Sequence, residues 1–97
     1  MYIGFLISAL IIGIIYVMYN NIIIRIAKLL MKVSTQNEEN RLDYNTAAIL
    51  YMKVADYRKY LSKKIRIAFA EHLDDVDWPD NSAGNLLRRT AALLRGY

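Results

Sequence analysis

The N-terminal segment of this 97-residue chain limits its possible folds more than any other feature. Residues 3–24 contain no charged side chain, and more than half of these positions are isoleucine, leucine, valine or phenylalanine. A helix rises ~1.5 Å per residue, so this segment would be about 33 Å long and would cross a hydrocarbon core of about 30 Å. We therefore expect a transmembrane helix over residues 3–24.

A cleaved signal peptide is the alternative for this segment. Such a peptide has a basic first region, an apolar core of roughly 7–15 residues and a cleavage site made of small residues. Here Tyr2 follows Met1 with no lysine or arginine, the apolar run is longer, and no small-x-small site closes it. These features favour a membrane span that is retained.

Asn20 and Asn21 interrupt the apolar run near its end, directly after Tyr19. Because tyrosine favours the headgroup level of a bilayer, the simplest interpretation is that these residues mark the membrane interface. In the alternative, Asn20 forms a hydrogen bond with a neighbouring membrane helix. Ala9 and Gly13, four residues apart, fit a packing face for such a helix, although small residues also occur in ordinary spans.

Three cations follow the span at intervals of three and four residues. Arg25, Lys28 and Lys32 therefore share one helical face, which suits contact with anionic lipid headgroups where the helix leaves the membrane. Cations next to a span also predict its orientation, because they collect on the cytoplasmic side. We expect the N-terminus outside and the C-terminal part in the cytoplasm, at a bacterial inner membrane.

Residues 34–40, with the sequence STQNEEN, form a polar break that predicts an interruption of the helix, with a straight continuation as the alternative.

Residues 41–73 contain no glycine or proline, and their apolar side chains fall on one stripe of a helical wheel. We expect one long amphipathic basic helix there. Its Lys59, Lys63 and Lys64 are either a solvated face or a surface for anionic lipid or an acidic partner. Nucleic acid is not an expected partner, because no binding motif accompanies the charge.

Arg58 lies within the apolar stripe, so it needs a carboxylate partner. The acidic turn over residues 74–82 would supply one by folding back, or a different subunit would. This turn lacks the glycine and the late glutamate of a calcium loop, and no metal site is expected. We expect Asp77 or Asp80 to cap the next helix instead. The single histidine, His72, is expected to be a structural or surface residue.

Residues 83–97 predict a short C-terminal helix with a weak first turn at Gly84 and an end at Gly96. A helix of this length is marginal alone, so it must dock on the long helix, on a membrane or on a partner. The expected fold is all-α: a membrane helix with a juxtamembrane amphipathic extension over residues 1–33, and then a small helical hairpin. The side chains expected at contacts with partners are aromatic, aliphatic or cationic residues of this hairpin: Arg58, Trp78, Tyr51, Phe69, Leu86 and Leu93.

The composition bears on the functional classes. The chain has no cysteine, no predicted nucleophile beside a base and no glycine-rich phosphate loop, so neither a catalytic site nor a cofactor is expected. A non-catalytic accessory or assembly subunit, bound to other membrane-protein subunits, fits these features best. Two alternatives remain. One is a self-assembling, holin- or toxin-like protein that acts as a homo-oligomer, and the other is a membrane-tethered adaptor.

Overall fold

The computed structural model describes the backbone of residues 2–96 and the side chains of residues 9–14 and 17–96. Within these residues the chain is helical, with no strand. The all-α class and the long apolar N-terminal helix are thereby confirmed. The helices are α1 (Tyr2–Glu38), α2 (Tyr44–Tyr57), η1 (Arg58–Tyr60), which is a short 3-10 helix, α3 (Lys63–Asp74) and α4 (Ser82–Arg95).

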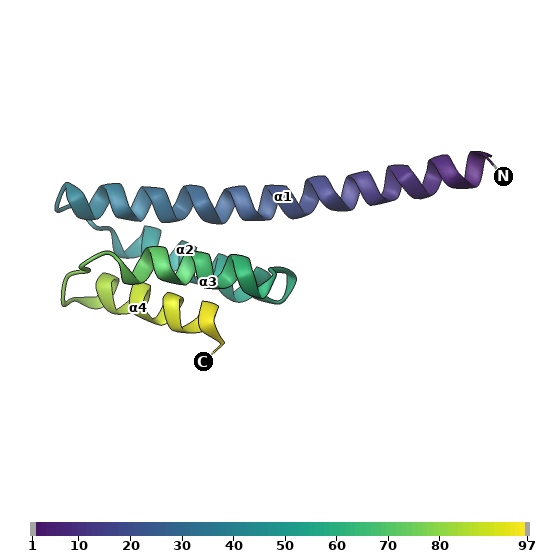
Figure 1. The fold of residues 1–97 in the computed structure, drawn as a ribbon. Coiled ribbons are helices and arrows are strands. Elements are labelled where there is room, and N and C mark those ends of the chain that lie inside the picture. The colour runs from purple at the N-terminus through teal and green to yellow at the C-terminus, as the bar shows by residue number, and fades with distance from the viewer. Residues whose placement is uncertain (1, 97) are drawn as a thin grey trace.

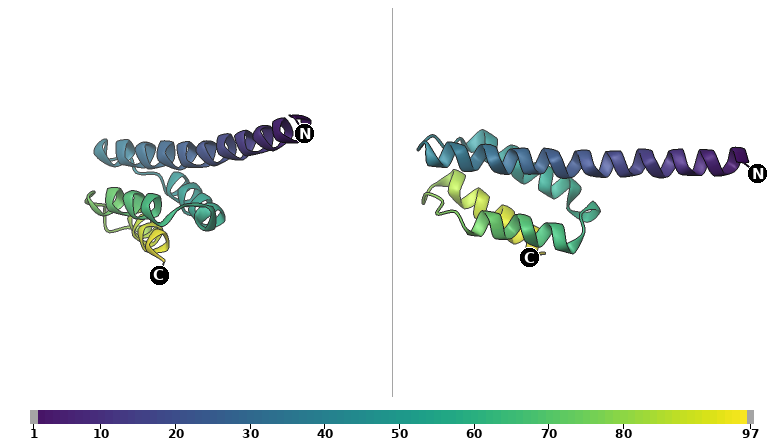
Figure 2. Two further views of the ribbon diagram at one scale, coloured as in Figure 1. Left: turned by 45° about the vertical axis from the view of Figure 1, so that its right-hand side comes forward. Right: turned by 45° about the horizontal axis from the view of Figure 1, so that its top comes forward.

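The helices α2, η1, α3 and α4 form a compact group beside the second half of α1, which we call the helical domain (Figure 1). Short connections over residues 39–43, 58–62 and 75–81 make successive α-helices run in alternating directions. α2 packs against α1, and α4 packs against both α2 and α3. The first half of α1 extends beyond the domain in each of the views in Figures 1 and 2.

α1 continues through most of the segment in which we expected a break. It ends at Glu38, and Asn40 then adopts a left-handed conformation with φ 56°. Asparagine tolerates this left-handed conformation better than most residues. The turn is closed by the N–H of Arg41, which donates to the carbonyl of Gln36 at 2.8 Å. The interruption predicted over residues 34–40 therefore lies several residues later, over residues 39–43.

The polar side chains of this segment bond to the helical domain instead of capping a new helix. Ser34 Oγ lies 3.2 Å from His72 Nε2, and Asn37 Nδ2 donates to the carbonyl of Asp77 at 3.4 Å. Asp43 provides the actual cap of α2, because its side chain accepts from the N–H of Asn45 at 3.1 Å. These bonds explain why α1 stays helical to Glu38.

The single helix predicted over residues 41–73 is wrong. The chain leaves α2 after Tyr57, and Leu61 and Ser62 are extended, with ψ 138° and 155°. Ser62 then caps α3 by accepting from the N–H of Ile65 at 3.3 Å. An unbroken helix would carry Arg58 into the apolar stripe. The break leaves Arg58 half-buried, and it allows both α2 and α3 to pack on α4.

α4 supplies the centre of the core. Its residues Ala83, Leu87, Ala91 and Leu94 recur at helical spacing and are buried. The C-terminal helix thus docks on the remainder of its own chain; it ends at Arg95, and Gly96, with φ 100°, caps it. The buried apolar side chains that share this core come from α1, α2, α3 and the two later connections: Ile26, Leu30, Val33, Ala47, Leu50, Val54, Leu61, Ala70, Leu73 and Trp78.

Gly84 permits a close contact between α4 and the connection before it. A Cβ atom at this position would lie 1.8 Å from the carbonyl oxygen of Pro79. The N–H of Gly84 donates to Asn81 Oδ1 at 2.9 Å, so Asn81 caps α4, and the prediction that Asp77 or Asp80 would do so is wrong. The glycine that weakens the first turn in isolation is needed for this packing.

Gly84→Ala should lower the free energy of unfolding of the helical domain by at least about 2 kcal/mol, because the added methyl group collides with the Pro79 backbone. Circular dichroism during denaturation in mild detergent would measure this. Gly13→Ala is the matched control, since nothing lies within 4 Å of its added Cβ. The control should change stability by no more than about 1 kcal/mol. Equal stability of the two variants would contradict the close contact.

Candidate functional site

The first half of α1 presents large apolar side chains to its surroundings. Leu10, Ile12 and Met18 are each at least 59% exposed. In the described part of the chain, α1 is the one helix that is long and apolar enough to cross a membrane. Its most apolar stretch is 6% buried inside the protein, whereas the core helix of a soluble protein would be mostly buried.

The environment of α1 changes near Tyr19. Ile22 and Ile23 pack partly against the domain core, and Ile26 is fully buried in it. Ile24, the last residue of the predicted span, is 48% exposed, so the helical domain covers only one side of α1 at this level. Residues 2–20 would form about 28 Å of helix, which is close to the ~30 Å of a hydrocarbon core. That Asn20 and Asn21 mark an interface stays a prediction.

The connection between α2 and α3 lies beside α1 at this same level (Figure 1). We call residues 57–64 the tip of the helical domain. The backbone N–H of Ser62 donates to the hydroxyl oxygen of Tyr19 at 3.2 Å, which joins the tip to α1. The tip thus lies next to the last turns of the exposed apolar part of α1.

A cleft of about 400 Å³ separates the tip from α1. Its lining is mostly apolar and consists of Met18, Tyr19, Ile22, Tyr57 and Tyr60. Tyr57 and Tyr60 are not among the predicted site residues, although both stand close to Lys59 in the sequence. What the sequence does not reveal is the turn that brings both tyrosines to the level of Tyr19.

The cations predicted to meet lipid headgroups fall into two sets. Lys59, Lys63 and Lys64 are exposed at the tip, in η1 and in the first turn of α3. Lys28 and Lys32 are exposed on α1, about 14 and 20 Å along the helix from Tyr19 at 1.5 Å per residue.

Arg25 is also exposed, about 9 Å along α1 from Tyr19. It therefore lies between the two sets. The tip and Arg25 are closer to the level of Tyr19 than Lys28 and Lys32 are.

The residues predicted to contact partners do not gather on one surface. Trp78 is buried, and its Nε1 donates to the carbonyl of Leu73 at 2.7 Å, so it anchors the domain internally. Phe69 lines a small cleft against α1, whereas Leu86 lines a different cleft beside α2. The remaining two, Tyr51 and Leu93, are half-buried.

The acidic turn does not supply the carboxylate predicted for Arg58. Asp74 pairs with Arg95, and Asp80 lies 3.9 Å from Arg88. Among the interactions of the described residues, no carboxylate pairs with Arg58, and its Nε is buried without a hydrogen-bond partner. Arg58 is half-buried, and the alternative that a different subunit supplies its partner stays a prediction.

The residues predicted for packing within the membrane are found on different parts of α1. Ala9 and Gly13 are exposed and line a shallow apolar groove of about 400 Å³ together with Leu10, Ile14, Val17 and Met18. Asn20 is half-buried at the level of the tip and lies outside this groove. Ala9 and Gly13 thus share one groove, and a hydrogen bond from Asn20 to a neighbouring helix stays a prediction.

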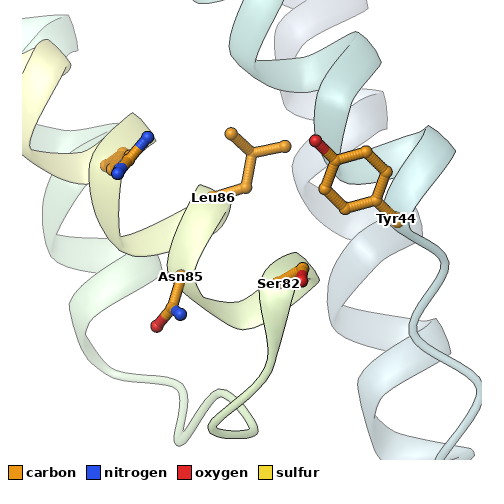
Figure 3. A pocket seen from close by; sticks show the side chains of 5 residues that line it. Tyr44, Ser82, Asn85 and Leu86 are labelled. Atoms are coloured by element: carbon orange, nitrogen blue, oxygen red, sulfur yellow. The ribbon is translucent and has the colours of Figure 1, made fainter.

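A second cleft, of about 240 Å³, opens between the start of α2 and the first turns of α4 (Figure 3). Tyr44 and Leu86 face one another across it, and Ser82, Asn85 and Arg89 complete its lining. These side chains include no carboxylate or imidazole that would act as a general base. The arrangement offers hydrogen-bond donors but no group that activates a nucleophile.

The structure also pairs Ser34 with His72, which the sequence analysis did not foresee. A catalytic serine needs donors for an oxyanion in addition to a base. Ser34 lies inside α1, where the backbone N–H groups are used by the helix. The contact is therefore best described as a link between α1 and α3.

Comparisons of the chain with protein-family models, curated proteins and solved structures returned no match. The function therefore has to be inferred from the residues of this chain and from their arrangement.

Tyr19→Phe should loosen the tip, because it removes the acceptor of the Ser62 N–H. A net hydrogen bond of about 1 kcal/mol corresponds to roughly fivefold faster amide exchange at Ser62. Hydrogen–deuterium exchange of the detergent-solubilised chain would measure this. Exchange in α4 should stay unchanged. A uniform increase across the domain would instead indicate that Tyr19 stabilises the whole fold.

Proposed function

We propose that this chain is a single-pass membrane protein that serves as a non-catalytic accessory or assembly subunit of a larger membrane complex. The observation that carries the proposal is the continuity of α1. One helix contains both the exposed apolar half and the stripe on which the helical domain is packed. A subunit built in this way holds its membrane surface and its domain surface in one fixed geometry, as simultaneous contact with a larger assembly requires.

The membrane half of α1 offers a surface for another helix. At Gly13 nothing lies within 4 Å of an added Cβ, so the groove beside Ala9 and Gly13 is open. Small residues let two helix backbones approach closely within a bilayer, where van der Waals packing is the main attraction between apolar helices. Another subunit of the complex would fill this groove.

The charges of α1 support an orientation for the proposed subunit. Residues 3–24 carry no charge, and Arg25, Lys28 and Lys32 follow directly. Cations close to a span favour the cytoplasmic side. The proposal accordingly has the helical domain on the cytoplasmic face of a bacterial inner membrane.

Native mass spectrometry of the protein, extracted from its own membrane in mild detergent, tests the proposal. We expect a heteromeric complex of fixed stoichiometry. Gly13→Leu should reduce the recovery of this complex at least about tenfold, because the larger side chain fills the groove. Ile12→Leu is the matched control, since Ile12 is exposed on α1 but does not line the groove.

The other functional classes give different results in the same experiment. A homo-oligomer that Gly13→Leu dissociates would favour a self-assembling membrane-active protein. A monomer unaffected by either substitution would contradict the accessory-subunit proposal and favour a membrane-tethered adaptor.

A further inference from the structure

We propose that the tip of the helical domain rests on the bilayer surface and binds anionic phospholipid headgroups. In this arrangement Lys59, Lys63 and Lys64 contact lipid phosphates, and Tyr60 lies at the headgroup level. The inference rests on the membrane placement of α1 in the proposed function. It adds a lipid-binding surface on the helical domain itself, distinct from the groove at Ala9 and Gly13, although Met18 borders both that groove and the cleft beside the tip.

The level of the tip along α1 is the first support. Ser62 is hydrogen-bonded to Tyr19, and the cleft beside the tip is lined by Met18 and Ile22 of α1. Met18 is 59% exposed and precedes the side chains of α1 that pack partly against the helical domain, which begin near Ile22. If the exposed apolar part of α1 lies in hydrocarbon, the tip is at the membrane surface, because the hydrogen bond and the packing of α1 on the domain fix its height.

The chemistry of the tip is the second support. Its three lysines are exposed, and residues 57–64 contain no acidic side chain to neutralise them. Tyr60 is 55% exposed, and the Lys59 ammonium lies 5.2 Å from the centre of its ring. Lysine near an anionic surface and tyrosine at the headgroup level are both favoured, so one short segment combines the two preferences.

The cleft between the tip and α1 fits the same location. Three tyrosines, one methionine and one isoleucine line it, so a mostly apolar lining also includes hydroxyl groups. The upper part of an acyl chain and its ester region likewise combine apolar and polar groups. A phospholipid held at the tip would therefore place its phosphate near the lysines and its first methylenes in the cleft.

The geometry also separates these lysines from Lys28 and Lys32. Those two cations lie about 14 and 20 Å along α1 beyond Tyr19. At physiological ionic strength the Debye length is about 8 Å, so charges at these heights interact only weakly with the membrane surface. The lipid composition should therefore change the water accessibility of the tip and leave that of α1 around Lys28 and Lys32 unchanged.

Site-directed spin labelling of the full chain in lipid nanodiscs tests the inference. The chain has no cysteine, so single cysteines are introduced without a background. Ile12→Cys reports on the span, Tyr60→Cys on the tip and Met31→Cys on the exposed face of α1 above it. Collisions with oxygen, which concentrates in lipid, are compared with collisions with a water-soluble nickel complex. The discs contain either phosphatidylcholine alone or phosphatidylcholine with phosphatidylglycerol.

We expect the label at residue 12 to be in lipid in both discs and the label at residue 31 to be in water in both. The label at residue 60 should lose accessibility to nickel at least about threefold when phosphatidylglycerol is present. If the label at residue 60 is equally water-exposed in both discs while residue 12 is in lipid, the inference is overturned and the membrane placement of α1 still holds. A label at residue 12 in water would overturn the membrane placement, and the inference with it.

A pair of charge variants identifies the residues responsible. Lys59→Gln combined with Lys63→Gln should bring the change in nickel accessibility at residue 60 from about threefold to less than about 1.5-fold, since each lysine near an anionic surface contributes substantially to binding. Lys28→Gln combined with Lys32→Gln removes the same charge and should leave the effect intact. Equal loss in both variants would show that net charge, and not the tip, is recognised, and would overturn the inference.

Discussion

The burial of one stripe of α1 against the helical domain is the interaction on which the rest of the structure depends. Ile26, Leu30 and Val33 are almost fully buried and recur at intervals of four and three residues. At about 25 cal/mol per Å² of apolar surface removed from water, three such side chains contribute several kcal/mol. Without this contact, α2, α3 and α4 would form a small bundle with an uncovered apolar face, and the tip would have no fixed position along α1.

The sequence is sufficient to predict the helical class and the apolar half of α1. An uncharged stretch of this length has few stable alternatives to a helix in lipid, because every backbone polar group must be satisfied internally. The docking of the short C-terminal helix is also predictable, because Leu87, Ala91 and Leu94 form a stripe too apolar to remain exposed. In both cases one physical effect is much larger than those that oppose it: backbone hydrogen bonding in lipid for α1, and burial of apolar surface for α4.

The connections were harder to predict, because each depends on side chains distant in sequence. Residues 34–40 have the composition of a break, yet Ser34 and Asn37 find partners on the domain, and α1 continues. In residues 41–73 helical periodicity hides the turn at the tip, because α2 and α3 both contribute apolar side chains to one core. That turn brings the tip, with Lys59, Lys63 and Lys64, to the level of Tyr19. The candidate lipid surface is therefore visible only in the folded chain.

The hydrogen bond between the tip and Tyr19 has a mechanical consequence. A helix that ends in a flexible linker adjusts to a thicker or thinner bilayer by sliding or tilting. In the proposed placement α1 would not be free in this way, because the helical domain is wider than the helix and would meet the membrane surface at a fixed residue. The helical domain would therefore limit how deeply α1 enters the bilayer. A bilayer thinner than the segment before Tyr19 would make α1 tilt, and that tilt would press one side of the domain into the headgroups and lift the other.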